Sequence, residues 1–220
     1  MRYFPAFLDL HDKRCVIVGA GQVAERKVRV LLRAGASVDV IAPRLSSGLS
    51  LLKKEGEIRH RMRLYRSGDL RGAFFVIAAT DNRAINERVA REAEKKNILI
   101  NVVDDPALCN FIVPSRVERG DLVIALSTSG KSPALARALR QRLQREIGPE
   151  YAFLLKLLGE ARRRILPLRW GQRRNQEIFR WLVGQNFQTL IQEKNLDELD
   201  RRLMKKLGPE FSLKELGLKK

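Results

Sequence analysis

Two adjacent carboxylates follow an apolar run in this 220-residue sequence. Residues 98–103, ILINVV, predict a buried strand, and Asp104, Asp105 and Pro106 come directly after it. A carboxylate at the end of such a strand can act as a general base that accepts a proton from a bound substrate. Aspartates before a proline also serve as turn formers. We favour Asp104, which immediately follows the strand, as the candidate base.

A glycine-rich turn supplies a second chemical signal. The segment GAGQVA, residues 19–24, has the spacing G-x-G-x-x-A between a predicted strand and a predicted helix. Gly19 suits a tight turn, Gly21 lets the backbone approach a pyrophosphate, and Ala24 allows close packing of helix on strand. The helix N-terminus would favour the phosphate charge. The segment predicts dinucleotide binding, and the alternative is a tight turn without a ligand.

The end of the second predicted strand bears on the choice between NAD and NADP. NAD sites usually place an acid there, where it binds the ribose 2′-hydroxyl. The strand SVDVIA is instead followed by Pro43 and Arg44, and its acid, Asp39, lies mid-strand. Arg44 has the chemistry to favour the additional phosphate of NADP. These residues by themselves leave the cofactor open.

Strand and helix patterns alternate through the first half of the chain. Predicted strands cover residues 15–21, 37–42, 57–65, 74–80 and 98–103. Predicted helices cover residues 22–35, 45–56 and 83–96, and Asp81 or Asn82 caps the last of them. This alternation is typical of an α/β fold with a Rossmann-like, doubly wound parallel sheet. Thr80, at the end of one strand, is a further candidate for contacting the cofactor.

The strand predicted at residues 57–65 differs from the others because it alternates. Ile58, His60, Met62 and Leu64 would share one apolar face, with arginines on the other. We therefore expect His60 to have a structural role and not to act as a ligand.

The pattern changes after Pro114. Residues 116–130 predict one strand followed by a loop rich in Ser, Thr and Gly. A helix capped by Ser132 follows over residues 132–148, and a helical pattern with breaks near Pro167 and Gly184 continues to residue 207. The last residues, 212–220, predict a frayed tail.

Composition limits the class of protein. The chain is 45% hydrophobic and 31% charged, which is globular rather than disordered. It lacks a signal-peptide pattern and any apolar run of about 18–20 residues, so we expect no membrane segment. Two cysteines, Cys15 and Cys109, suit a reducing cytoplasm. A net charge of +18 suits an anionic partner such as nucleic acid, an anionic membrane surface or a polyanionic small molecule, or else a solvated basic face.

Several segments together resemble a known family. These are GAGQVAERK, AATDNRAINERV, NVVDDP, FIVPS and STSGKSPALAR. In this order they resemble the precorrin-2 dehydrogenase/sirohydrochlorin ferrochelatase family, the siroheme-forming module, over residues 3 to about 183. The chain is similar to the stand-alone form, because it ends too early to hold the methyltransferase domain of multifunctional siroheme synthases.

The resemblance implies an activity and an assembly. It implies NAD-dependent oxidation of precorrin-2 to sirohydrochlorin and, in some members, insertion of ferrous iron at the same site. It also implies a homodimer. The family's reactive aspartate lies in an N-x-x-D-x-P arrangement, which falls on Asp104. Its cofactor contacts fall on the glycine turn, including Gln22 and Val23, and on Pro43 and Arg44.

The substrate implied by this family is a polycarboxylate tetrapyrrole, which basic and hydroxyl side chains would hold. The candidates for substrate binding are Asn101, Arg116, Thr128, Ser129, Lys131 and Arg137. No group of His, Cys and acidic residues has the spacing of a metal site, so iron would be a substrate held mainly by the tetrapyrrole.

The expected organisation has three parts. Residues 1–113 form an NAD-binding Rossmann domain, residues 114–147 a small α/β dimerisation segment, and residues 148–220 a helical C-terminal domain. We expect no nucleic acid as partner. The alternative function is a nucleotide-sensing Rossmann module fused to a basic, helical nucleic-acid-binding region, although no helix-turn-helix pattern is recognisable.

Overall fold

The computed structural model describes residues 3–219, which separate into two compact units. The first unit ends at Val113 and the second begins at Pro114. The glycine turn and Asp104 belong to the first unit, and the Ser/Thr-rich loop belongs to the second.

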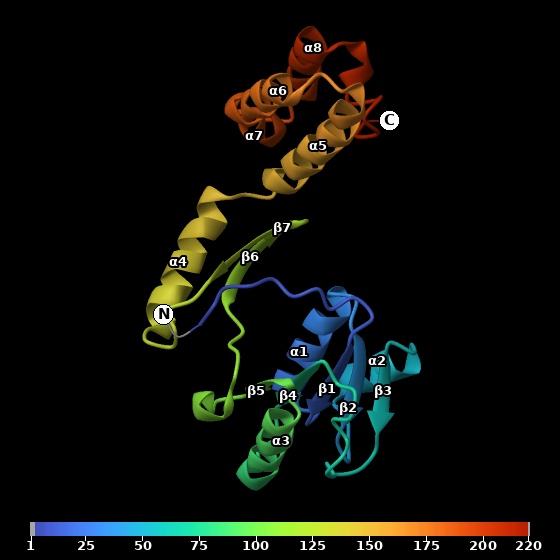
Figure 1. The fold of residues 1–220 in the computed structure, drawn as a ribbon, viewed down its shortest axis with the longest axis vertical. Helices are drawn as coiled ribbons and strands as arrows, with labels where there is room; N and C mark the ends of the chain where they lie inside the picture. Colours follow the sequence, from blue (N-terminus) through green and yellow to red (C-terminus); the bar gives the residue numbers. More distant parts are fainter. Residues whose placement is uncertain (1–2, 220) are drawn as a thin grey trace. The chain divides into compact units, whose positions relative to one another are not determined.

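A five-stranded parallel sheet with the order β3-β2-β1-β4-β5 forms the first unit (Figure 1). The strands are β1 (Arg14–Val18), β2 (Ser37–Ile41), β3 (Ile58–Arg61), β4 (Phe75–Ala78) and β5 (Leu99–Val102). The helices are α1 (Gln22–Arg33), α2 (Ser47–Lys54) and α3 (Arg83–Lys95). The direction of winding reverses between β1 and β4, where open α/β sheets bind their ligands. The predicted doubly wound parallel sheet is confirmed.

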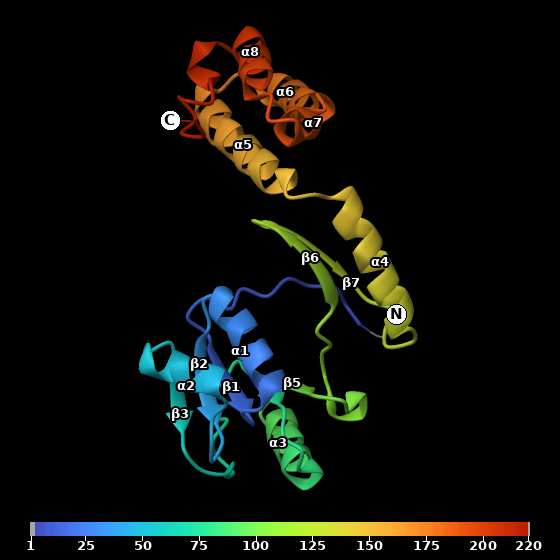
Figure 2. The same cartoon turned by 180° about the vertical axis from the view of Figure 1, so that it is seen from behind.

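Helices cover both faces of this sheet, as the side chains of β1 show. Cys15 and Ile17 pack in one core with residues of α1 and α2, whereas Val16 and Val18 pack in a second core with α3. Figure 2, seen from behind, also shows α1 and α3 on opposite sides of the strands. Because both faces are buried, β1 is apolar from Cys15 to Val18, and each fully buried aliphatic side chain contributes about 1.5–3 kcal/mol.

The strand predicted at residues 57–65 is too long. β3 ends at Arg61, and Met62 and Leu64 are 71% and 59% exposed, so the expected apolar face does not continue past His60. Arg61 and Arg63 donate side-chain hydrogen bonds of 2.9 and 2.7 Å to Asp69. These charged contacts fold the chain back as a loop instead of continuing the sheet.

The buried side chain of Asp69 anchors this loop, which comprises residues 62–69. It is 5% exposed and also accepts a 2.8 Å hydrogen bond from the backbone N–H of Arg66. The hydrogen bond from the Arg63 side chain is the main influence that lowers the pKa of Asp69 to about 2. Asp39, 4% exposed on β2, is held in the same way by the side chains of Arg14 and Arg59 at 2.8 and 2.7 Å.

The second unit starts with an antiparallel hairpin of β6 (Ser115–Arg119) and β7 (Leu122–Leu126). The prediction of a single strand here is wrong. Gly120 has a φ of 58°, a left-handed conformation that glycine adopts without steric cost, and it reverses the chain between the two strands.

Five helices follow in the described part of this unit. They are α4 (Pro133–Glu146), α5 (Glu150–Ile165), α6 (Gln172–Gly184), α7 (Phe187–Gln192) and α8 (Leu196–Leu207). Side chains of α5, α6, α7 and α8 enclose one apolar core that includes the fully buried Phe187. The breaks predicted near Pro167 and Gly184 are confirmed.

The prediction of a frayed tail is wrong for residues 212–219. Leu213 and Leu216 are 0% and 5% exposed in the helical core. The guanidinium of Arg164 donates hydrogen bonds to the backbone carbonyls of Glu210 and Glu215. Leu213 and Leu216 therefore pack in the apolar core with side chains of α5 and α8, which the sequence pattern of the tail did not predict.

Replacing Asp69 tests whether the loop anchor contributes to stability. The folded pKa of about 2 is below the usual 3.8, so the ionised carboxylate stabilises the fold above pH 4 and this contribution is lost as the pH falls towards 2. We expect Asp69→Asn to lower the free energy of unfolding by about 2–3 kcal/mol at pH 7 and by much less at pH 2. Urea denaturation at both pH values measures this. Glu94→Gln, at an exposed position of α3, is the control, and an equal loss at both pH values would contradict the ionic explanation.

Candidate cofactor and catalytic site

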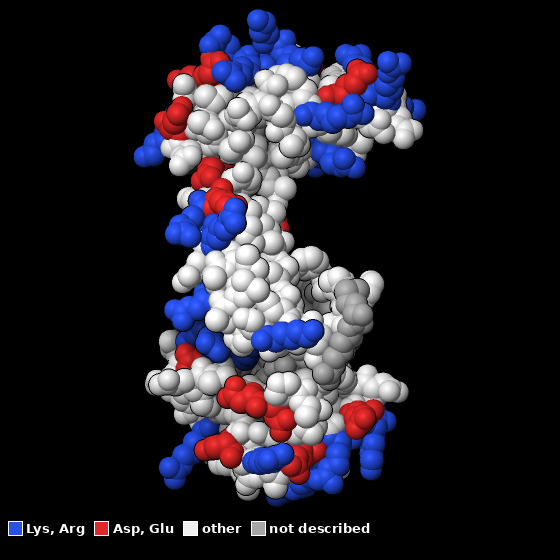
Figure 3. Space-filling view, turned by 90° about the vertical axis from the view of Figure 1, so that its left-hand side faces the viewer, with Lys and Arg blue, Asp and Glu red and all other residues white. Residues whose placement is uncertain are grey.

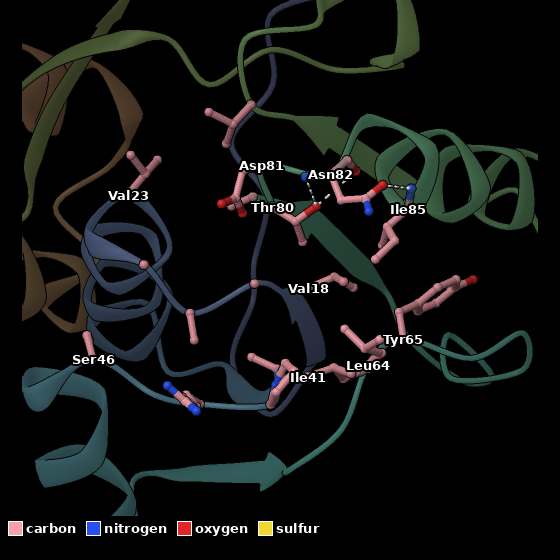
Figure 4. A pocket seen from close by; sticks show the side chains of 18 of the residues that line it. Val18, Val23, Ile41, Ser46, Leu64, Tyr65, Thr80, Asp81, Asn82 and Ile85 are labelled. Carbon is pink, nitrogen blue, oxygen red and sulfur yellow. Dashed lines mark hydrogen bonds between the residues drawn. The ribbon is translucent and has the colours of Figure 1, made fainter.

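A cavity of about 1100 Å³ opens where β1, β2 and β4 end. Figure 4 shows Val23 on α1, Ile41 at the end of β2, and Thr80 and Ile85 on the opposite side. The predicted residues that line this cavity are Gly19, Gly21, Gln22, Val23, Pro43, Arg44, Thr80 and Asp104. The cavity is large enough for a dinucleotide, since ligand pockets are typically about 300–1,000 Å³.

The two glycines of the turn are needed for different reasons. Gly19 has a φ of 108°, and a Cβ there would overlap the carbonyl oxygen of Ala79, so a side chain is excluded by the adjoining backbone. A Cβ on Gly21 would meet no atom within 4 Å. Gly21 precedes α1 and no side chain caps that helix, so the N–H groups of its first turn remain for a phosphate. Ala24 does not line the cavity; it is fully buried against the sheet.

The loop after β2 is tied to the first turn of α1. The hydroxyl of Ser46 donates a 2.6 Å hydrogen bond to Glu25, and Arg29 donates to the same carboxylate at 2.8 Å. These bonds, with the one from Ser46 foremost, lower the pKa of Glu25. Ser46 also caps α2 by accepting from the N–H of Leu49. Pro43 and Arg44, which precede it, are thereby held at the edge of the cavity.

Thr80 is fixed by a buried amide. Its hydroxyl donates a 2.7 Å hydrogen bond to the side chain of Asn86, and the Asn86 amide donates a 2.8 Å bond to the Thr80 carbonyl. Asn82 accepts from the N–H of Ile85 and so caps α3, which settles the choice between Asp81 and Asn82 (Figure 4).

The sequence analysis missed the residues of the loop after β3. Leu64 and Tyr65 line the cavity beside Ile41, whereas the alternating pattern assigned Leu64 to a strand (Figure 4). The Tyr65 hydroxyl donates to Glu92 of α3, which also accepts from the N–H of Gly68. Burial and this bond raise the pKa of Tyr65. The turn residues Ser67 and Gly68 were the available signal for a loop.

Asp104 occupies a sharp turn after β5. It is exposed on the cavity lining with a φ of 60°, a left-handed conformation that aspartate tolerates better than most residues. The thiol of Cys109 supports this turn, because it accepts from the N–H of Val102 at 3.1 Å and donates to the carbonyl of Asp105 at 3.3 Å. Asn101 does not line the cavity, and its side-chain amide faces Cys109 and Phe111.

The other predicted substrate residues lie in the second unit. Thr128 and Ser132 close the loop before α4 by exchanging hydrogen bonds of 3.1 and 3.2 Å. Ser129, Lys131 and Arg137 are exposed. Arg116, on β6, pairs with Glu118.

Residues 3–219 contain neither a cluster of metal-ligating side chains nor a membrane-spanning helix. Among them no three His, Cys, Asp or Glu side chains gather as they would around a metal ion. Over the same residues, no helix has the length and apolar content to cross a bilayer.

Comparisons with known proteins agree with this geometry. A family model for NAD(P)-binding domains matches residues 6–115, and one for the central part of a sirohaem biosynthesis protein matches residues 119–146. The siroheme synthase of Nitrosospira multiformis is 46% identical over 169 residues, 75% of this chain and 36% of that protein. The siroheme synthase of Photorhabdus laumondii is 35% identical over 218 residues, 99% of this chain and 46% of that protein.

A solved structure, "SirC, precorrin-2 dehydrogenase", superposes with a TM-score of 0.76 at 25% identity, over 90% of this chain and 100% of that one. The chain spans less than half the length of the curated siroheme synthases named above. The reversed winding, the glycine turn and the cavity define an NAD(P)-binding, Rossmann-like protein. The chain belongs to the family of siroheme synthase N-terminal modules and precorrin-2 dehydrogenases.

Alanine at each glycine separates folding from cofactor binding. We expect Gly21→Ala to keep the melting temperature but to weaken NAD⁺ binding at least about tenfold, because the new methyl projects into open space at the phosphate turn. Gly19→Ala should lower the melting temperature, because its methyl collides with Ala79. Thermal unfolding and calorimetric titration with NAD⁺ measure the two effects. Gly159→Ala, which adds a methyl in α5, is the control; unchanged NAD⁺ binding by Gly21→Ala would refute the assignment.

Proposed function

We propose that this chain oxidises precorrin-2 to sirohydrochlorin with NAD⁺, and that Asp104 is the general base. The observation that carries the proposal is that Asp104 lines the same cavity as the glycine turn. A dehydrogenation needs a hydride acceptor and a proton acceptor: a dinucleotide held by the turn would supply the first, and Asp104 at the end of β5 the second. The sequence similarity to siroheme synthases and to a precorrin-2 dehydrogenase supports the choice of substrate.

In this proposal, groups of the chain have two roles: some bind the cofactor, and Asp104 accepts a proton. The N–H groups at the start of α1 would hold the pyrophosphate, and Leu64 and Tyr65 would offer an apolar wall. Bound NAD⁺ would supply the hydride acceptor for the oxidation. The Asp104 carboxylate takes the proton that leaves the macrocycle and, being exposed, returns it to water. The left-handed turn, held by Cys109, keeps the carboxylate at the cavity.

We further propose that the tetrapyrrole carboxylates bind basic and hydroxyl groups of the second unit, with Thr128, Ser129, Lys131 and Arg137 as candidates. Lys131 and Arg137 are exposed and have the charge for this role. Ferrous iron would enter as a second substrate, and Asp104 would accept the pyrrole protons that chelation releases. We also propose a cytoplasmic location, which the two free thiols of Cys15 and Cys109 suit.

A homodimer is part of the same proposal, and α4 supports it. Within its unit α4 buries no residue, and Leu135 and Leu139 are 51% and 40% exposed on one face. Figure 3 shows uncharged atoms beside Lys and Arg atoms over this part of the unit. A face of exposed leucines one helical turn apart is suited to packing against a second copy of the hairpin and α4.

Asp104→Asn tests the base. We expect loss of turnover by at least about a hundredfold, since a positioned base contributes about 10²–10⁴ to the rate, with unchanged NAD⁺ affinity and melting temperature. Anaerobic formation of NADH from precorrin-2 measures turnover. Asp105→Asn is the matched control and should keep most of the activity. Normal turnover by Asp104→Asn would exclude it as the base.

A double change on α4 tests the dimer. Leu135→Glu with Leu139→Glu places two charges on the apolar face, so we expect the protein to become a monomer in size-exclusion chromatography with light scattering. Leu51→Glu, at a leucine of α2 that is 52% exposed, should not alter the mass. A monomeric unaltered protein, or a double variant that stays dimeric, would refute this interface.

A further inference from the structure

A second cavity adjoins the cofactor cavity beyond the end of β2. It has a volume of about 460 Å³ and lies in the first unit. We call this cavity the cationic pocket. It is lined by Pro43, Arg44, Leu45, Ser50, Lys53, Lys54, His60 and Met62. Pro43, Arg44 and Leu45 line both cavities, so the two meet at the loop after β2.

The cationic pocket concentrates positive charge without compensation. Arg44, Lys53 and Lys54 line it together with no carboxylate. All three side chains are exposed, and no ion pair involving them is found among residues 3–219. Lysines in the last turn of α2 are expected to offset the helix dipole, but that does not explain why the same lining also carries an arginine and no acid. An anion would relieve the mutual repulsion of these charges.

The cofactor cavity has no acid at this end. In NAD-specific sites an acid at the end of the second strand binds the 2′-hydroxyl and repels a 2′-phosphate. Here Asp39 of β2 is 4% exposed and is held by Arg14 and Arg59. The acids that do line the cavity, Asp81 and Asp104, follow β4 and β5 instead of β2. No acid that lines the cavity at the β2 end therefore excludes a phosphate; Glu25, which accepts from Ser46 of this loop, does not line it.

We propose that the cationic pocket binds the 2′-phosphate of NADP⁺, so that the protein accepts NADP⁺ as well as NAD⁺. The inference rests on the proposed cofactor site. A phosphate monoester carries a charge of about −1.5 to −2 at neutral pH, which suits a guanidinium that binds it through paired hydrogen bonds and lysines that act as point charges. His60 forms a fixed wall, because its Nε2 is 2.8 Å from the carbonyl oxygen of Ala42.

Calorimetric titration of the full chain with NAD⁺ and NADP⁺ tests this. We expect NADP⁺ to bind at least as tightly as NAD⁺ and to weaken more steeply with salt. Lys53→Ala with Lys54→Ala should weaken NADP⁺ by about tenfold and NAD⁺ by less than about twofold, because only the former carries the 2′-phosphate. Lys95→Ala, which removes a lysine from the last turn of α3, is the control and should change neither affinity.

Further arms separate the sources of phosphate. 2′-AMP should bind more tightly than 5′-AMP, and the lysine double variant should abolish the difference. If inorganic phosphate binds the pocket but NADP⁺ binds at least about tenfold more weakly than NAD⁺, the pocket takes free phosphate and the inference is wrong. Equal weakening of both cofactors by the double variant would also overturn it. Binding of NAD⁺ alone leaves the proposed function standing, whereas binding of neither cofactor refutes both.

Discussion

The pairing of β1 between β2 and β4 is the constraint on which the site depends. Parallel pairing sends the carboxyl ends of these strands to one edge, so the glycine turn, the loop at Pro43 and the segment at Thr80 meet there. The approach is close enough that Gly19 can carry no side chain beside Ala79. The same pairing extends through β4 to β5 and brings Asp104 to the cavity. Apolar burial on both faces of the sheet therefore positions polar chemistry at its edge.

Paired charges position what the sheet does not. The loop that follows β3 presents Leu64 and Tyr65 to the cavity, although it has left the sheet. Asp69 holds it with side-chain bonds from two arginines, and Glu92 holds the Tyr65 hydroxyl from α3. Such ion pairs cost desolvation when they form, but removing one partner is destabilising because the other charge is left unpaired, and here the pairs also define one loop conformation. Part of the large excess of arginine is thus structural.

The remaining positive charge has a different character. Arg44 and the lysines at the end of α2 face a cavity without acids, and the exposed Lys131 and Arg137 belong to the second unit. Both groups suit anions, one a phosphate monoester and the other carboxylates. We propose that this remaining charge binds ligands, whereas the arginines paired with Asp39 and Asp69 maintain the fold.

The sequence by itself determined the doubly wound sheet, the glycine turn and the position of Asp104 at the end of a strand, because the apolar period, the glycine spacing and the alternation of strands and helices can be read from neighbouring residues. It did not determine the end of β3, the hairpin at Gly120 or the packed tail at Leu213. Those depend on partners distant in the chain: Asp69 for the loop, and the helical core for the tail. Likewise, Asn101 matched a family pattern, yet its side chain contacts Cys109 and Phe111 instead of lining the cavity. Tertiary contacts decided which face each side chain presents, and this no local pattern records.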